Sequence, residues 1–130
     1  MQVPGGQFLA MSVTYPRRDV IQVGELTIQL PDGLVCVDGR ALMLSVREFG
    51  LLLALARAEG RILSRAQLYL EVWGKPLSRR DRSVDVYVHK LRAKLEAAQP
   101  SVRFIHTHVG FGYRLSRERL QDLHNSATES

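Results

Sequence analysis

The pattern of apolar residues changes near residue 45, and this change limits the folds open to the chain. Before that point, apolar and polar residues alternate in short runs between turn signals, as in antiparallel strands. After it, apolar residues recur at the three- and four-residue spacing of helices, and two short strand-like runs follow Pro100. A chain of 130 residues can bury one modest core. The pattern therefore predicts a single domain of the α+β class.

Three strands are expected in the first third of the chain. They span Gly24–Leu30, Leu34–Val37 and Arg40–Leu44. Pro31–Gly33 and Asp38–Gly39 separate them, and both are turn sequences because proline presets φ and glycine accepts the left-handed conformation. A small antiparallel sheet is therefore expected at the start of the fold.

The limits of the domain follow from composition. Proline, glycine and charged residues crowd residues 1–20, which are expected to form a tail or linker. The domain is expected to span residues 21–116. Residues 117–130 are expected to form a C-terminal tail with a short helical piece. The start lacks the basic and apolar regions of a secretion signal. No stretch approaches 18 uninterrupted apolar residues, so no membrane association is expected.

Three helices are expected after the sheet. Ser45–Glu48 and Ser64–Gln67 are capping boxes, in which the serine hydroxyl accepts from a backbone N–H and the last side chain reaches back. Each box opens a helix, and the second helix runs to about Trp73. After a loop at residues 74–80, the third helix is expected over Asp81–Ala97.

Positive charge is concentrated around the third helix. The chain has a net charge of +5. The segment Trp73–Arg117 holds ten Lys and Arg against three Asp and Glu, a local net of +7, so the rest of the chain carries about −2. A local concentration of this kind is typical of a surface that meets nucleic acid rather than of an even solubilising coat.

The third helix has an apolar edge opposite a basic arc. At about 100° per residue, the residues of the apolar edge are Val84, Val88, Leu91 and Leu95. The residues of the opposite arc are Arg79, Arg82, Val86, His89, Lys90 and Ala93. Small side chains would let this arc approach a groove of DNA, where the basic ones could donate to guanine. Taken alone, the arc could equally be a solvated basic face.

A sheet, three helices and a hairpin at residues 102–115 follow one another in the order of a winged helix-turn-helix. The motifs that carry a resemblance are Leu44-Ser45 with Glu48-Phe49, Gly60–Arg65 with Leu68, Val72-Trp73-Gly74, Arg82–Val86 with Leu91-Arg92 and Lys94-Leu95, and Ile105, Thr107, Gly110 and Gly112-Tyr113. The order and spacing of these motifs make the chain resemble the OmpR/PhoB-type effector domain of bacterial two-component response regulators. The resemblance covers about Val23–Leu115. The resemblance implies a four-stranded N-terminal sheet, a three-helix core and a C-terminal wing, with the third helix in the major groove.

The basic arc and the resemblance together suggest the site residues. The residues expected to read bases are Val86, His89 and Lys90. The residues expected at phosphates, mainly from the resemblance, are Trp73, Arg82, Ser83, Tyr87, Arg92 and Tyr113. The wing residues are Thr107, His108 and Val109. Phosphate contacts would fix the register of the protein on DNA without reading its sequence.

Two residues near this surface have structural alternatives. Trp73 could donate its indole N–H to a phosphate, or it could serve mainly in packing. Asp85 is expected to pair with Arg82 or Lys90 and orient it, rather than to meet DNA.

The wing departs from the pattern of the family. The family usually has arginine, or another long or polar residue, where this chain has Val109, and a hydrophobic residue where it has His108. Either His108 has become the minor-groove probe or this wing contributes little.

No catalytic, metal or cofactor site is expected. His106 and His108 share a strand face and could chelate a metal, but no third and fourth ligand is evident. Neither a nucleophile–base–acid set nor a phosphate-binding glycine loop is present. Cys36 stands alone in an apolar run, which excludes an intrachain disulfide and fits a reducing cytoplasm.

The expected partners are double-stranded DNA, RNA polymerase and, from the resemblance, tandem copies of the domain on direct repeats. The alternative is a protein-interaction module that docks on RNA polymerase or another partner through loop 74–80; the basic third helix favours DNA. The receiver domain of the family lies N-terminal to the effector domain. Residues 1–20 are too short for a receiver, so an excised or a stand-alone effector domain is expected.

Overall fold

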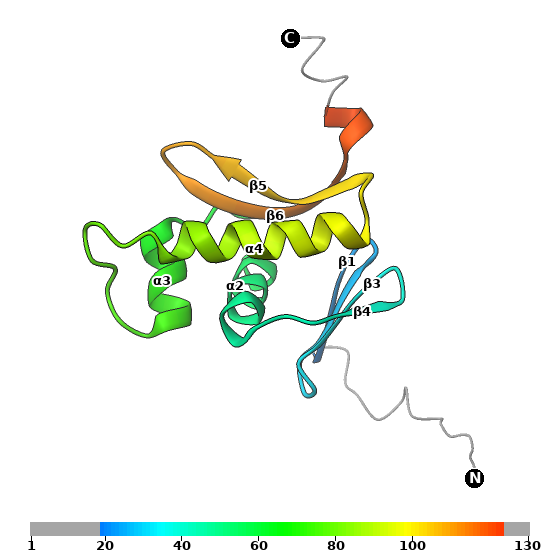
Figure 1. The fold of residues 1–130 in the computed structure, drawn as a ribbon, viewed down its shortest axis with the longest axis horizontal. Coiled ribbons are helices and arrows are strands. Elements are labelled where there is room, and N and C mark those ends of the chain that lie inside the picture. The colour runs from blue at the N-terminus through cyan, green and yellow to red at the C-terminus, as the bar shows by residue number, and fades with distance from the viewer. Residues whose placement is uncertain (1–18, 124–130) are drawn as a thin grey trace.

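The computed structural model describes residues 19–123 (Figure 1). Most of the expected N-terminal tail and residues 124–130 of the expected C-terminal tail lie outside the described residues. The elements in chain order are β1 (Val20–Val23), β2 (Leu26–Gln29), β3 (Leu34–Val37), β4 (Arg40–Leu42), α2 (Val46–Arg57), α3 (Arg65–Trp73), α4 (Ser83–Ala98), β5 (Val102–His108) and β6 (Gly112–Arg119). A helical turn at residues 120–123 follows β6. The α+β winged helix-turn-helix expected from the sequence is confirmed.

Strands β1 to β4 form one antiparallel sheet in chain order. Strand β3 has its predicted limits, and β4 ends two residues before the expected Leu44. The prediction of one strand over Gly24–Leu30 is wrong at its start. Gly24 has a φ of +57°, so the chain turns there, and β2 begins only at Leu26 after the preceding strand β1.

The local signals for turns and caps are confirmed. Asp38 and Gly39 both have positive φ, at 53° and 82°, as a two-residue hairpin turn requires. Both capping boxes are closed, at Ser45–Glu48 before α2 and at Ser64–Gln67 before α3. Helix α4 begins two residues later than expected, at Ser83, because the carboxylate of Asp81 accepts the Ser83 N–H at 2.7 Å.

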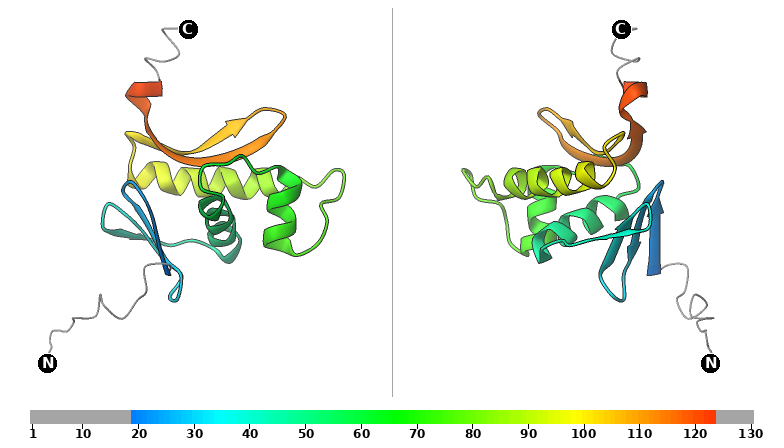
Figure 2. Two further views of the ribbon diagram at one scale, coloured as in Figure 1. Left: turned by 180° about the vertical axis from the view of Figure 1, so that it is seen from behind. Right: turned by 45° about the vertical axis from the view of Figure 1, so that its right-hand side comes forward.

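Helix α4 runs through the middle of the molecule (Figure 1). The β5–β6 hairpin lies along one side of it, and α2 and α3 lie along the other, as all views agree (Figure 2). The largest fully buried side chains come from the sheet, the helices and β5, and include Leu26, Ile28, Leu51, Leu55, Leu68, Leu91, Leu95 and Phe104. One core therefore joins all parts of the fold.

The hairpin is fastened to the rest of the fold at both ends. Near its tip, Leu63 and Tyr113 exchange backbone hydrogen bonds of 2.8 and 2.9 Å. At its base, Arg117 donates two hydrogen bonds to the carboxylate of Glu25, at 3.0 and 2.9 Å. Strand β6 thus continues to Arg119, past the domain end that was expected at residue 116. Among the helices of residues 19–123, none is long and apolar enough to span a bilayer.

Candidate nucleic-acid interface

The two faces of α4 differ in burial as the sequence predicted. The apolar edge is buried, with exposures of 0–1% for Val84, Val88, Leu91 and Leu95. On the opposite face His89, Lys90 and Ala93 are exposed, and Val86 is 47% exposed. An apolar side chain left in water within a basic face can gain contact from a thymine methyl, while the residues beside it can donate to base edges. We call Val86, His89, Lys90 and Ala93 the open face of α4.

An aromatic cluster supports one border of the open face. The Lys90 ammonium lies 5.0 Å from the centroid of the Tyr87 ring, within range of a cation–π interaction. Tyr87 meets Trp73 edge-on at 5.7 Å, and Trp73 stacks on Tyr69 at 4.8 Å. The guanidinium of Arg47 lies 4.9 Å from the Trp73 ring. The packing role left open for Trp73 is therefore present, and its phosphate contact stays a prediction.

A basic hollow lies at the start of α4. Its volume is about 620 Å³, and its lining residues are Arg65, Leu77, Arg79, Arg80, Asp81, Arg82 and Asp85. The side chain of Arg82 is 82% exposed, and Ser83 is the first residue of the helix. The N-terminus of a helix favours anions, and guanidinium groups bind phosphate oxygens in pairs. Arg82 thus lies beside other guanidinium groups that could bind a phosphate, although Asp81 and Asp85 line the same hollow and the Ser83 N–H already donates to Asp81.

Asp85 connects α4 with α3 and with the hairpin. Its Oδ1 accepts hydrogen bonds from Arg65 Nε at 2.7 Å and from the Tyr113 hydroxyl. Its Oδ2 lies 3.8 Å from Arg82 Nη1. The expected pairing with Arg82 is therefore present but long. The expected alternative, Lys90, is wrong, because its ammonium lies over an aromatic ring instead.

The environment of Asp85 keeps its carboxylate ionised. Burial would raise its pKa, but the hydrogen bonds from Tyr113 and Arg65 outweigh burial and hold the pKa below its usual value. The pKa of Tyr113 is raised by burial and by its bond to Asp85, so its hydroxyl keeps its proton. The Tyr113 side chain is therefore a hydrogen-bond donor to a charged acceptor inside the protein.

Two of the expected phosphate residues have contacts within the fold, because Arg92 contacts the hairpin and Tyr113 belongs to it. Tyr113 is only 5% exposed and its hydroxyl donates to Asp85, so this hydroxyl is not available to a phosphate oxygen. Arg92 donates from Nη2 to Thr107 Oγ1 at 2.7 Å, and its guanidinium lies 6.0 Å from the Tyr113 ring. Its Nε is buried and has no hydrogen-bond partner within residues 19–123. Arg92 thus helps to hold the hairpin on α4.

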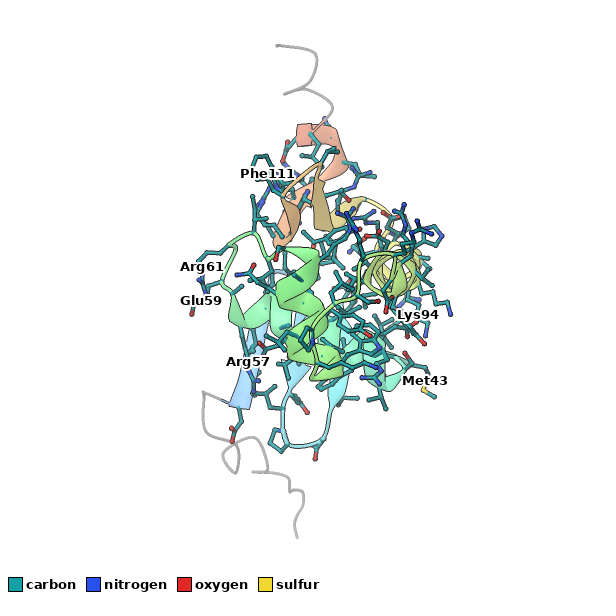
Figure 3. The ribbon with its side chains drawn as sticks, turned by 90° about the vertical axis from the view of Figure 1, so that its left-hand side faces the viewer. Met43, Arg57, Glu59, Arg61, Lys94 and Phe111 are labelled. Carbon is teal, nitrogen blue, oxygen red and sulfur yellow. The ribbon has the colours of Figure 1, made fainter. Side chains whose placement is uncertain are left out.

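The tip of the hairpin is apolar. Val109 is 89% exposed and Phe111 is 72% exposed. His108 is half-buried, and its Nε2 accepts a hydrogen bond from Arg114 Nε at 3.0 Å. This contact holds the imidazole against β6, so the geometry does not favour His108 as the replacement probe. Phe111 lies on the side of the molecule away from Lys94 of α4 (Figure 3), and Val109 is the more exposed of the two apolar residues, so Val109 is the better candidate to meet a groove.

The two histidines of the H-x-H sequence contact different partners. His106 is buried, and its Nε2 lies 2.8 Å from the carbonyl oxygen of Ser116 and 3.5 Å from Glu118 Oε2. Burial lowers its pKa. His108 contacts Arg114 instead. Nowhere in the described part of the chain do three His, Cys, Asp or Glu side chains gather as metal ligands would.

Arg65 was not predicted as a site residue. Its position just after the cap of α3 indicated only a helix start. In the structure it lines the basic hollow and bonds Asp85, twenty residues further on. The sequence indicated this role only through the position of Arg65 in the first turn of the second helix, because the second helix of a helix-turn-helix packs against the third.

Comparison with known proteins agrees with this geometry. Residues 39–115 match the family described as "Transcriptional regulatory protein, C terminal". The sensory transduction protein RegX3 of Mycobacterium leprae and the transcriptional regulatory protein CreB of Escherichia coli are each 38% identical over 96 residues. These alignments cover 74% of this chain but 48% and 42% of the two relatives. The chain thus spans about half the length of such relatives.

Two solved DNA-binding domains agree in fold along nearly their whole length. The DNA-binding domain of CpxR from E. coli is 32% identical, with a TM-score of 0.68 over 75% of this chain and 95% of that one. The DNA-binding domain of RstA from Klebsiella pneumoniae, in complex with the RstA box, is 33% identical with the same score over 75% and 96%. The chain belongs to the family of C-terminal domains of transcriptional regulatory proteins, of the OmpR/PhoB winged-helix type.

Proposed function

We propose that this chain binds duplex DNA at specific sequences as the DNA-binding module of a bacterial transcriptional regulator. Helix α4 enters the major groove and the hairpin lies at the minor groove. Within the open face, Val86, His89 and Lys90 read bases. The residues proposed at phosphates are Trp73, Arg82, Ser83, Tyr87 and Arg92.

The observation that carries the proposal is the division of α4 into a buried edge and an open face. The same helix that anchors the core also presents an exposed valine, 47% exposed, between basic residues. The major groove admits a helix and offers thymine methyls and guanine acceptors side by side. The valine alone would not distinguish this face from a solvated one, since Val46 is 85% exposed elsewhere, but its place among basic residues on a helix of the winged fold does favour a groove. The related RstA domain was solved in complex with the RstA box, which supports DNA binding by a domain of this fold.

The wing is proposed as the weaker contact. Val109 carries no hydrogen-bond donor in its side chain and His108 is held by Arg114. Minor-groove binding therefore depends on backbone groups and on shape rather than on an inserted cation. We expect most sequence preference to come from α4.

The proposed partners beyond DNA are a second copy of the domain on direct repeats and RNA polymerase. Copies on one face of the duplex would recur at about 10–10.5 base pairs. Loop 74–80 and the exposed Leu70 of α3, 55% exposed, are the surface proposed for polymerase. The place of action would be the bacterial cytoplasm, where the DNA lies. These partners would belong to the activity of a longer protein.

Duplex binding is tested by fluorescence anisotropy with sequences selected from a random pool, at several salt concentrations. About five phosphate contacts predict a slope of log affinity against log salt of roughly −4 to −5. Sedimentation of the free chain and of its complex on a direct repeat then counts the copies bound. A chain that fails to bind any duplex at low salt would refute the proposal and favour the protein-interaction alternative.

A matched pair of variants distinguishes the contribution of the open face to sequence preference from the effect of total charge. Lys90→Ala should weaken the selected site by about 1–3 kcal/mol relative to unrelated duplexes. Arg57→Ala removes the same charge from the last turn of α2, which lies across the molecule from Lys94 of α4 (Figure 3). It should leave the difference in affinity between the selected and the unrelated duplexes unchanged. Equal effects of the two substitutions would place the base contacts elsewhere.

A further inference from the structure

We propose that Asp85 is a positioning residue that sets the specificity of the DNA-binding surface, by restraining Arg65 and Arg82 and by fixing the hairpin on α4. This inference rests on the proposed function. It assigns a role in recognition to an acidic side chain that is not itself expected to touch DNA.

The position of Asp85 needs an explanation because a carboxylate beside bound phosphates is unfavourable. Asp85 is the acidic residue in the first turn of α4, next to the hollow proposed for phosphate. Its side chain is 25% exposed, so the repulsion from DNA would be only partly screened. The compensating contacts are those it makes within the protein, with three different elements of the interface.

The first contacts are with two arginines. Arg65 and Arg82 are 43% and 82% exposed in their side chains, and both approach the carboxylate of Asp85. Without it, Arg65 would turn freely toward whichever phosphates lay within reach, and Arg82, which is already proposed at a phosphate, would lose the carboxylate that orients it. Phosphate contacts of that kind strengthen binding to every sequence alike. Asp85 therefore lowers the affinity for unrelated DNA and leaves discrimination to the open face.

The second contact fixes the hairpin. Tyr113, which donates to Asp85, stands directly opposite Thr107 in the register of β5 and β6. Thr107 in turn accepts from Arg92, two helical turns beyond Asp85 on α4. One rung of the hairpin is thus held from two points along the helix. The angle between α4 and the hairpin, and hence which groove positions both can reach together, depends on these two bonds.

The test compares two isosteric substitutions on the same helix. Asp85→Asn keeps an acceptor for Arg65 and Tyr113 but removes the charge. Glu96→Gln removes the same charge about three turns further along, on nearly the same side of α4. Anisotropy titrations of the full chain with its selected duplex and with an unrelated duplex, at several salt concentrations, give both affinities and both salt slopes. Circular dichroism checks that each variant is folded.

For Asp85→Asn we expect tighter binding to the unrelated duplex, a salt slope steeper by about 1 because Arg65 is released, and a roughly tenfold lower preference for the selected site. Glu96→Gln should leave the preference unchanged. If the two variants behave alike, Asp85 acts only through net charge and the proposal is overturned. If the wild-type chain binds no duplex, it is the proposed function that fails.

A third variant tests the hairpin contact separately and covers the case in which Asp85→Asn does not fold. Tyr113→Phe removes one hydroxyl and leaves both arginines paired with Asp85. It should weaken binding to the selected duplex several-fold, with the salt slope and the affinity for unrelated DNA unchanged. Preference equal to that of the wild type would overturn the role assigned to this bond.

Discussion

The ion pair between Glu48 and Lys94 should cost very different amounts when one or the other partner is removed. Lys94 Nζ lies 2.7 Å from Glu48 Oε1, but the Glu48 side chain is 4% exposed and that of Lys94 is 42% exposed. Replacing Lys94 with methionine leaves a buried carboxylate, and breaking a buried pair in this way costs about 3–5 kcal/mol. Because the Ser45 N–H still donates to the same oxygen at 2.8 Å, we expect the lower end, about 3 kcal/mol.

The opposite substitution should be mild. Glu48→Gln keeps an acceptor for the Ser45 N–H, as Gln67 does in the second capping box, and leaves the half-exposed Lys94 its hydrogen bond to the Met43 carbonyl at 2.7 Å. We expect a loss of about 1 kcal/mol in the free energy of unfolding. For a domain of this size, Tm should fall by about 4–8 °C for Glu48→Gln and by about 12 °C or more for Lys94→Met. Thermal unfolding at neutral pH, followed by circular dichroism, measures both.

The pH dependence gives an independent check. In the wild type, burial raises the pKa of Glu48, but the bonds from Lys94 and Ser45 outweigh it and hold the pKa below its usual 4.5. This stabilisation is present above pH 4.5 and is lost as pH falls through the folded-state pKa. In Lys94→Met we expect burial to outweigh the remaining bonds from Ser45 and to raise the pKa of Glu48 above its usual value, so mild acidification should restore stability to this variant. Equal losses for both variants at neutral pH, or a Lys94→Met protein that only weakens toward acid, would refute the reasoning.

Three further predictions concern the interface and the hairpin. Arg82→Ala should weaken selected and unrelated duplexes alike and flatten the salt slope by about one, which titration at several salt concentrations measures; a changed sequence preference would reassign Arg82 to base reading. Val109→Arg should tighten binding and steepen the slope by about one, because it adds a cation at the exposed tip; an unchanged slope would mean that the tip stays away from DNA. Gly112→Ala should destabilise the fold by about 3 kcal/mol or more in thermal unfolding, because its Cβ would lie 2.0 Å from the Leu63 carbonyl oxygen and its φ is +141°; an unaltered Tm would show that the hairpin adjusts freely.

Features set by neighbours in the chain could be predicted from the sequence. The turn at Asp38–Gly39, the two capping boxes and the buried edge of α4 depend on spacings of one to four residues, and all were found as expected. The break at Gly24 was missed because the predicted strand was drawn from Gly24 onward, where Leu26, Ile28 and Leu30 alternate in one phase. The apolar residues before it, Ile21 and Val23, stand in the other phase, and the positive φ of Gly24 turns the chain between the two paired strands.

Features that depend on distant side chains could not be predicted. Arg65 meets Asp85, and Arg92 meets Thr107, across 20 and 15 residues of chain. A helical wheel gives the direction in which Arg92 leaves α4, but not that a threonine of the hairpin is within its reach. The same holds for Tyr113, which was expected at a phosphate. The sequence did not indicate that its hydroxyl donates to Asp85.

The paired backbone bonds between Leu63 and Tyr113 form an isolated β-bridge that ties the hairpin to the segment before α3. The two residues are separated by fifty positions in the chain, so closing this bridge also closes a loop that contains α3 and α4. Loop-closure entropy makes such distant contacts late events in folding. We therefore expect the amide protons of Leu63 and Tyr113 to exchange with solvent together, in one cooperative opening that separates the hairpin from the helices.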